Sequence, residues 1–163
     1  DGIAFGCLRA DASIDRERNA RIISIIHSHG KEAVFHRAFD CTSNPYESIE
    51  TLIELGADRL LTSGLKPKAV EGKVLLGALQ SAYGNCIEIL AGSGINASNA
   101  RKLMEETGIR QVHSSCKDWI TDPTTTSNAV TYGFAEPPHE NSYDVVSETL
   151  VRQLLDSLGE LGR

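Results

Sequence analysis

The feature that most constrains the fold is a strand-then-helix pattern that occurs five times within residues 1–116 of the 163-residue chain. Each unit begins with a short apolar run, typical of a buried strand, and most continue into a stretch with apolar residues on one helical face. The predicted strands begin near residues 3, 33, 59, 87 and 110, so one unit occupies 23–30 residues. Without hairpin signals between the units, this spacing indicates a parallel sheet joined by right-handed helical crossovers.

The chain is expected to form a single domain over residues 1–163, with its motifs within residues 1–116. The predicted strands cover residues 2–8, 33–39, 59–64, 87–91 and 110–115, and the predicted helices 14–29, 45–55, 67–83 and 98–107. Residues 117–141 are rich in Thr, Asp, Pro and Asn and are predicted to form a long surface loop. A helix over residues 142–161 is predicted to close the chain. Patterning leaves open whether the α/β sheet is doubly wound or part of a (β/α)8 TIM-type barrel, which typically needs ~250 residues.

The composition limits the kind of partner. The net charge is −6, and the 16 Lys and Arg residues are spread along the chain, so we expect no nucleic acid and no anionic membrane as a partner. A metal ion, a small anionic ligand or another protein remains. The four cysteines show no C-x-x-C spacing, which favours reduced thiols and a cytoplasmic location. The chain begins with Asp-Gly and enters a strand almost at once, so we expect a further segment upstream.

The run Ala33 to Asp40 changes from apolar to charged residues as it ends, which predicts the mouth of a parallel α/β fold. His36, Arg37 and Asp40 are the candidate catalytic residues there, for proton transfer or charge stabilisation. The alternative is that Arg37 and Asp40 form an ion pair that holds a loop and that His36 is a hydrogen-bonded wall residue. The sequence leaves both interpretations open.

Three consecutive predicted strands end in small residues that donate hydrogen bonds. Loops after the late strands of a barrel are the usual place for phosphate, so we predict an anion-binding site there. The alternative is that small residues merely allow tight turns. The candidate anion-binding residues are Thr62, Ser63, Gly64, Gly92, Ser93, Gly94, His113, Ser114 and Ser115.

The metal ligands are not predictable from spacing. His113 and Cys116 stand three residues apart, but an isolated pair is mostly coincidence, and a Cu(I) site normally recruits further thiolates or thioethers.

Several of these motifs together resemble the CutC copper-homeostasis proteins, over most of residues 1–116. The motifs are Asp1-Gly2 with Phe5-Gly6, Phe35-His36-Arg37-Ala38-Phe39-Asp40, Arg59-Leu60-Leu61-Thr62-Ser63-Gly64, Ala91-Gly92-Ser93-Gly94-Ile95 and Val112-His113-Ser114-Ser115. The resemblance implies a (β/α)8 barrel in which the five strands are the fourth to the eighth. It also implies copper as the associated metal, a cytosolic location and a homo-oligomer. Cysteines proposed as copper ligands in that family fall in the part absent here.

Three functions compete. The first is a copper-binding or copper-handling role in the cytosol, without catalysis, as the resemblance implies. The second is a barrel enzyme that acts on a small phosphorylated or carboxylated metabolite, for which no reaction can be assigned. The third is a truncated, inactive barrel fragment. Copper content and anion-dependent thermal stability separate the first two.

Overall fold

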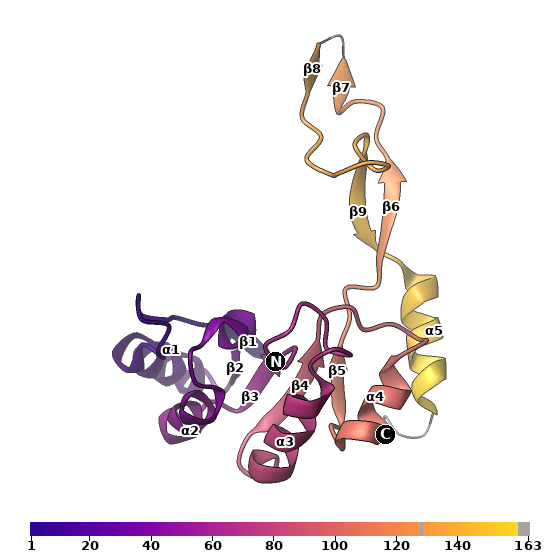
Figure 1. Ribbon diagram of the computed structural model, residues 1–163. Helices are drawn as coiled ribbons and strands as arrows, with labels where there is room; N and C mark the ends of the chain where they lie inside the picture. Colours follow the sequence, from indigo (N-terminus) through magenta and orange to yellow (C-terminus); the bar gives the residue numbers. More distant parts are fainter. Residues whose placement is uncertain (128, 160–163) are drawn as a thin grey trace.

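A computed structural model describes residues 1–127 and 129–159 and contains a five-stranded parallel sheet in the order β1-β2-β3-β4-β5 (Figure 1). The register of each pair is parallel throughout, so the carboxyl ends of the strands lie along one edge of the sheet. The fold is therefore α/β, as the strand-and-helix spacing predicts. The strands are β1 Gly2–Phe5, β2 Glu32–Phe35, β3 Arg59–Thr62, β4 Glu88–Gly92 and β5 Gln111–His113.

Each strand of the first four is followed by a helix, and these helices lie on one side of the sheet (Figure 1). The helices are α1 Arg16–Ser28, α2 Pro45–Leu55, α3 Lys73–Tyr83 and α4 Ala100–Thr107. Local sequence fixes their ends. Asn44 caps α2 by accepting from the amides of Tyr46 and Glu47, and Pro45 occupies the first helical position. Gly56 then ends α2 in the left-handed conformation, at φ 83°.

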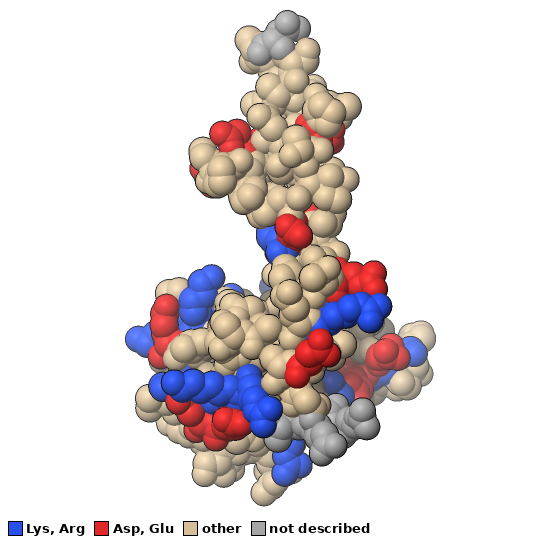
Figure 2. Space-filling model, turned by 90° about the vertical axis from the view of Figure 1, so that its right-hand side faces the viewer, with Lys and Arg blue, Asp and Glu red and all other residues tan. Residues whose placement is uncertain are grey.

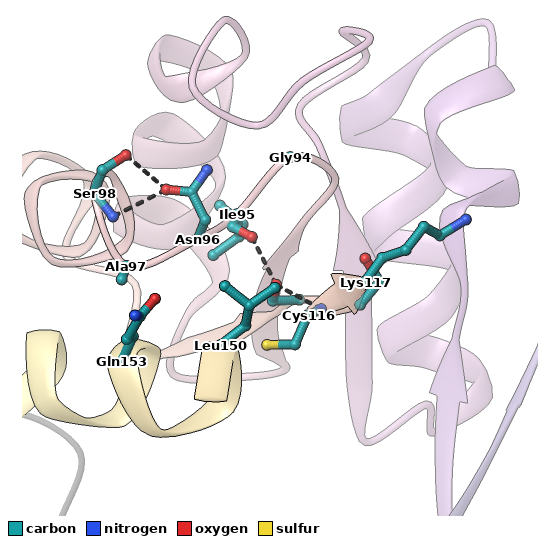
Figure 3. Close-up of a pocket in the computed structure, with 11 residues that line it drawn as sticks. Gly94, Ile95, Asn96, Ala97, Ser98, Cys116, Lys117, Leu150 and Gln153 are labelled. Carbon is teal, nitrogen blue, oxygen red and sulfur yellow. Dashed lines mark hydrogen bonds between the residues drawn. The ribbon is translucent and has the colours of Figure 1, made fainter. Parts of the chain in front are cut away.

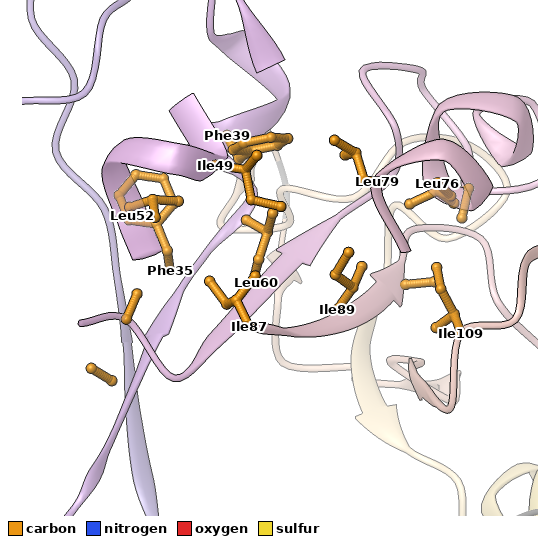
Figure 4. Packing of buried hydrophobic residues seen from close by; sticks show 14 of the residues in the cluster. Phe35, Phe39, Ile49, Leu52, Leu60, Leu76, Leu79, Ile87, Ile89 and Ile109 are labelled. Carbon is orange, nitrogen blue, oxygen red and sulfur yellow. The ribbon is translucent and has the colours of Figure 1, made fainter. Parts of the chain in front are cut away.

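The hydrophobic core lies between the sheet and α1–α4. On β2, β3 and β4 every second residue faces the helices and is buried, as Phe35, Leu60 and Ile89 illustrate (Figure 4). Leu52 from α2 and Leu79 from α3 are fully buried against this face. Burial of such side chains stabilises the fold by roughly 1.5–3 kcal/mol each.

The alternate residues of the same strands carry charge at the amino-terminal edge of the sheet. Arg59 pairs with Glu32 at 3.0 Å and with Glu88 at 2.9 Å, and donates to Gln111 Oε1 at 3.0 Å. Gln111 in turn donates to Glu88 Oε1 at 2.5 Å. One side chain from each of β2 to β5 thus joins a single polar network.

A second polar contact at this edge involves Asp58, just before β3. The amide of Ala33 donates to Asp58 Oδ2 at 2.6 Å, and His27 Nε2 lies 2.8 Å from the same oxygen. Burial by itself raises the pKa of Asp58, but the Ala33 amide and the His27 ring outweigh it and hold the pKa below its usual 3.8. The carboxylate therefore ties α1 to the start of β3.

The predicted strand over residues 33–39 is too long. The strand β2 ends at Phe35, and Arg37–Cys41 form a short 3-10 helix, η1. The His36 ring accepts from the amide of Ala38 at 3.2 Å, so this residue caps η1 in place of continuing the strand.

The predictions for residues 117–141 as a loop and 142–161 as a helix are wrong in part. Residues 117–146 form an arm that extends away from the sheet and its helices (Figure 1). Trp119, Tyr143 and the paired Val145–Val146 favour an extended chain, and the helix α5 begins only after the N-cap Ser147. The elements are β6 Lys117–Thr121, β7 Thr126–Ser127, β8 Val130–Thr131, β9 Ser142–Val146 and α5 Glu148–Leu158. Residues 160–161 of the predicted helix lie outside the described residues.

Among the helices described here, none is long and apolar enough to cross a membrane.

Candidate functional site

The candidate site lies along the carboxyl edge of the sheet, where the loops after β2 to β5 meet. Parallel α/β folds keep their binding residues at this edge. Two separate arrangements occur there: a network centred on Asp40, and a cavity between the loops that follow β4 and β5.

The carboxylate of Asp40 joins the loop after β2 to the loop after β3. It accepts from Arg37 Nε at 2.7 Å, from Thr62 Oγ1 at 2.5 Å and from the Ser63 amide at 3.0 Å. The Leu65 amide donates at 3.2 Å, and the Ser63 hydroxyl lies 2.8 Å away. Positive φ values at Gly64 and Leu65 turn the backbone so that these amides surround the carboxylate.

Asp40 is thus the anion that Thr62 and Ser63 hold in this structure. Its side chain is only 8% exposed, whereas the side chain of Arg37 is 41% exposed and also donates to the Ser63 hydroxyl at 2.9 Å. The contacts match the alternative in which Arg37 and Asp40 hold a loop. A catalytic role for Arg37 and Asp40, and an anion-binding role for Thr62, Ser63 and Gly64, stay predictions.

The ring of His36 packs over Gly6 at the end of β1. A Cβ built on Gly6 would lie 2.6 Å from the ring atoms Cε1 and Nδ1, so only glycine allows this approach. Because Nδ1 accepts from the Ala38 amide, the ring is held by both the cap and the glycine. Its use as a catalytic group stays a prediction.

A cavity of about 420 Å³ opens between the loops after β4 and β5, and α5 lies against one side of it (Figure 3). Leu150 and Gln153 project from α5 toward these loops. The volume is within the range of small-molecule sites, roughly 300–1,000 Å³. The lining residues are Gly94, Ile95, Asn96, Ala97, Ser98, Ser114, Ser115, Cys116, Lys117, Leu150 and Gln153.

Internal hydrogen bonds fix the two loops. The Ser114 hydroxyl donates to the Ile95 carbonyl at 2.7 Å and accepts from the Cys116 amide at 3.2 Å, which joins the loops to each other. Asn96 Oδ1 accepts from the amide and the hydroxyl of Ser98, so the turn before α4 is formed without a ligand. The cavity walls are therefore preorganised.

The glycine turn after β4 is shaped for close approach. Ser93 and Gly94 both have positive φ, 81° and 72°. A Cβ on Gly94 would lie 2.6 Å from Cδ of Lys68, whose aliphatic stem covers the turn. The Ser93 hydroxyl donates to the Pro67 carbonyl at 2.7 Å, so the loop after β3 supports the turn.

The structure brings together only part of the predicted anion site. Gly94, Ser114 and Ser115 line the cavity, whereas Thr62, Ser63, Gly64, Gly92, Ser93 and His113 do not. Sequence reasoning missed Asn96, Lys117, Leu150 and Gln153. The Asn-x-Ser pattern of residues 96–98 was a usable signal for a turn, but nothing in the sequence of α5 indicates that it lies over this edge.

The described residues do not fit a copper centre. No group of three or more His, Cys, Asp or Glu side chains is placed to hold a metal ion within residues 1–127 and 129–159. Cys116 is buried in the cavity wall, His113 is exposed and outside the cavity, and Cys41 and Cys86 are exposed at other places. Copper would need thiolate, thioether or imidazole ligands grouped together.

A family model described as the CutC family matches residues 1–118. A protein named CutC from Treponema denticola is 38% identical over 159 residues, which cover 97% of this chain and 64% of that protein. The corresponding protein from Pasteurella multocida is 45% identical over 118 residues, 72% of this chain and 48% of that protein. The chain therefore spans less than two thirds of the length of these relatives.

Solved structures agree with the α/β fold. One described as a proposed copper homeostasis protein CutC from Streptococcus agalactiae has a TM-score of 0.62 and 32% identity, covering 68% of this chain and 53% of that chain. One described as native KDPGal has a TM-score of 0.52 at 14% identity, covering 92% of this chain and 57% of that chain. The second likeness concerns the fold alone.

Proposed function

The chain belongs to the CutC family, and from this premise we propose that it binds a small phosphorylated or carboxylated metabolite at the carboxyl edge of its parallel sheet. The observation that carries the proposal is the 420 Å³ cavity between the loops after β4 and β5. Its walls combine hydroxyl and amide donors with the apolar side chains of Ile95 and Leu150. Such a mixture suits a compound with one anionic group and a short carbon skeleton.

Within this proposal, each wall has its own part. The hydroxyl of Ser115 and the backbone of the Gly94 turn offer hydrogen-bond donors from the two loops, whereas the ammonium of Lys117 is paired with Asp144 at 3.3 Å. Gln153 from α5 supplies an amide group opposite them (Figure 3). Leu150 packs on the same side and excludes water from the carbon skeleton. Binding and orientation of the ligand are the functions that these residues support.

The parallel sheet suits part of a (β/α)8 barrel, which we propose as the architecture of the family member. The polar network of Glu32, Arg59, Glu88 and Gln111 lies on the sheet face opposite the buried residues that pack on the helices. In a barrel that face is the interior, where side chains from neighbouring strands form layers. The network has the features expected of such a layer, because β2, β3, β4 and β5 each contribute one side chain to it.

The anion proposal is tested by thermal unfolding in the presence of inorganic phosphate. Phosphate at about ten times its Kd should stabilise the native chain by roughly 1.4 kcal/mol, because it binds only the folded state. The variant Gln153→Glu places a carboxylate in the cavity wall and should abolish the shift. The matched control Gln80→Glu makes the same change beside the opposite edge of the sheet and should keep it. No shift for the native chain, or equal shifts for both variants, contradicts the proposal.

A copper-handling role in the cytosol is the second candidate, and it is supported by the name of the Streptococcus agalactiae protein. Because the described residues do not by themselves fit a copper centre, bound copper would need further ligands from outside the described residues. The test is to express the chain in the cytosol of cells grown with added copper, purify it under reducing conditions, and measure its copper content. One copper per chain favours the second candidate, and copper at background level favours the first.

A further inference from the structure

The described lining of the cavity between the loops after β4 and β5 contains a single basic residue, and its charge is already used. The ammonium of Lys117 is paired with Asp144 at 3.3 Å and lies 5.1 Å from the Trp119 ring. In Figure 3 the Lys117 side chain extends away from Leu150 and Gln153, and Figure 2 shows a basic side chain against acidic ones at the base of the arm. The negative charge of a ligand therefore needs a partner from another element.

The glycine turn after β4 carries backbone donors that the protein itself leaves unused. The amides of Gly94, Ile95 and Ala97 donate no hydrogen bond to any residue that the structure describes. By contrast, the amides of Asn96 and Ser98 donate to asparagine side chains within the turn. Consecutive left-handed residues begin this turn, and such backbone forms anion-binding concavities. Among the described lining residues there is no carboxylate, so the turn suits an anion.

The loop after β3 brings a further lysine, Lys68, to this turn. A Cβ on Gly94 would lie 2.6 Å from Cδ of Lys68 and 3.5 Å from its Cε, so the stem of the lysine lies directly across the glycine. The Ala69 amide donates to the Ser93 carbonyl at 3.0 Å, and the Ser93 hydroxyl donates to the Pro67 carbonyl at 2.7 Å, which holds the loop there. Lys68 is exposed and forms no ion pair with a described residue. Its ammonium is thus available beside the cavity.

We propose that the ligand of this cavity is a phosphate ester and that Lys68 is the cation that binds its phosphoryl group. The inference rests on the function proposed above for the cavity. It narrows the ligand class to phosphorylated compounds and adds a residue from a third loop. The phosphoryl oxygens accept from the amides of the Gly94 turn and from the hydroxyl of Ser115, and the ammonium reaches them on its flexible stem.

The number of donors favours a phosphoryl group over a carboxylate. The three unused amides are joined by the ammonium of Lys68 and by the Ser115 hydroxyl, which makes no hydrogen bond with a described residue. A carboxylate offers two oxygens and a single charge. A phosphate ester offers three acceptor oxygens and a charge of about −1.5 to −2 at pH 7, so it gains more from the same set of donors.

The test removes the charge of Lys68 and keeps its stem. Lys68→Met retains an unbranched side chain over Gly94 and should weaken the binding of inorganic phosphate about tenfold, the effect of one lost charge-assisted hydrogen bond. Lys68→Arg keeps the charge and should retain most of the affinity. The matched control Lys66→Met removes the same charge from an exposed position on the same loop and should bind as the native chain does. Isothermal titration calorimetry at fixed ionic strength measures each affinity, and thermal unfolding without phosphate should be the same for all variants.

Two further probes test the ligand class. Acetate, the carboxylate probe, should bind the native chain about tenfold or more weakly than phosphate. Glycerol 3-phosphate should bind more tightly than inorganic phosphate, because its carbon skeleton contacts Ile95 and Leu150.

The contrary outcomes are distinct. Equal phosphate affinities for Lys68→Met and Lys66→Met overturn the role of Lys68, although the cavity would still bind phosphate. Acetate as tight as phosphate, or glycerol 3-phosphate no tighter than phosphate, overturns the assignment of a phosphate ester. A native chain that binds none of the three probes contradicts the proposed function itself, so the failure of one proposal is not mistaken for the failure of the other.

Discussion

Replacing Asp40 by asparagine should destabilise the chain more than any exposed carboxylate replacement. The carboxylate receives donors from Arg37, Thr62, Ser63 and Leu65, and its side chain is 8% exposed. Asparagine keeps one acceptor oxygen, loses the charge, and turns an NH2 group toward other donors. The loops after β2 and β3 would then lose their common anchor.

The magnitude follows from the contacts. A hydrogen bond to a charged group contributes roughly 1.5–3 kcal/mol, and at least two are lost. Loss of one partner of a fully buried pair costs about 3–5 kcal/mol, and the 41% exposure of Arg37 reduces this figure. We therefore expect about 3 kcal/mol for Asp40→Asn, which corresponds to a lower Tm by about 6–12 °C for a chain of this size.

Urea unfolding followed by circular dichroism measures this change. Asp156→Asn, on the exposed side of α5, is the matched control and should lie within about 0.5 kcal/mol of the native chain. A free energy of unfolding for Asp40→Asn that equals that of the control would refute the role of Asp40 as the anchor of the two loops.

Two further substitutions test charged contacts, one within the Asp40 network and one at Asp58 on the opposite edge of the sheet. Arg37→Lys should cost about 1 kcal/mol in urea unfolding, because lysine cannot donate to Asp40 and Ser63 with one planar group; an unchanged midpoint would contradict this. Asp58→Asn should lower the free energy of unfolding at pH 7. It should also weaken the dependence of this free energy on pH in the acidic range. Since the pKa of Asp58 is lowered in the folded chain, its contribution is present above the unfolded value near 3.8 and is lost as the pH falls below it. A variant whose pH dependence in the acidic range parallels that of the native chain would rule out this contribution.

The parallel sheet could be predicted because its information is local and repeated. Buried positions such as Phe35, Leu60 and Ile89 alternate or recur at regular spacing, and helix ends such as Asn44 and Gly56 carry their own capping signals. The α/β class and the boundaries of α2 follow from these patterns. The length of β2 could not be predicted from these patterns. His36 caps η1 while its ring packs over Gly6, and a contact between residues so far apart in the sequence leaves no local signal.

The arm and the cavity depend on contacts between distant residues. Residues 117–121 are polar at most positions, and only pairing with residues 142–146 makes them a strand. Leu150 and Gln153 enter the cavity because α5 returns to pack near α4, which periodicity cannot reveal. The hydroxyls of Thr62 and Ser63 looked like ligand donors in the sequence, and the structure directs them to Asp40.

The most direct test of ligand binding at the cavity is an amide chemical-shift titration with inorganic phosphate. The account predicts progressive shifts for the amides of residues 94–98 and 114–117 and for those near Gln153, with the amides of Arg59 and Glu88 at the other edge unchanged. Saturation at a single Kd in all shifted amides would identify one site. Shifts confined to other loops, or none in the two cavity loops at tens of millimolar phosphate, would contradict it.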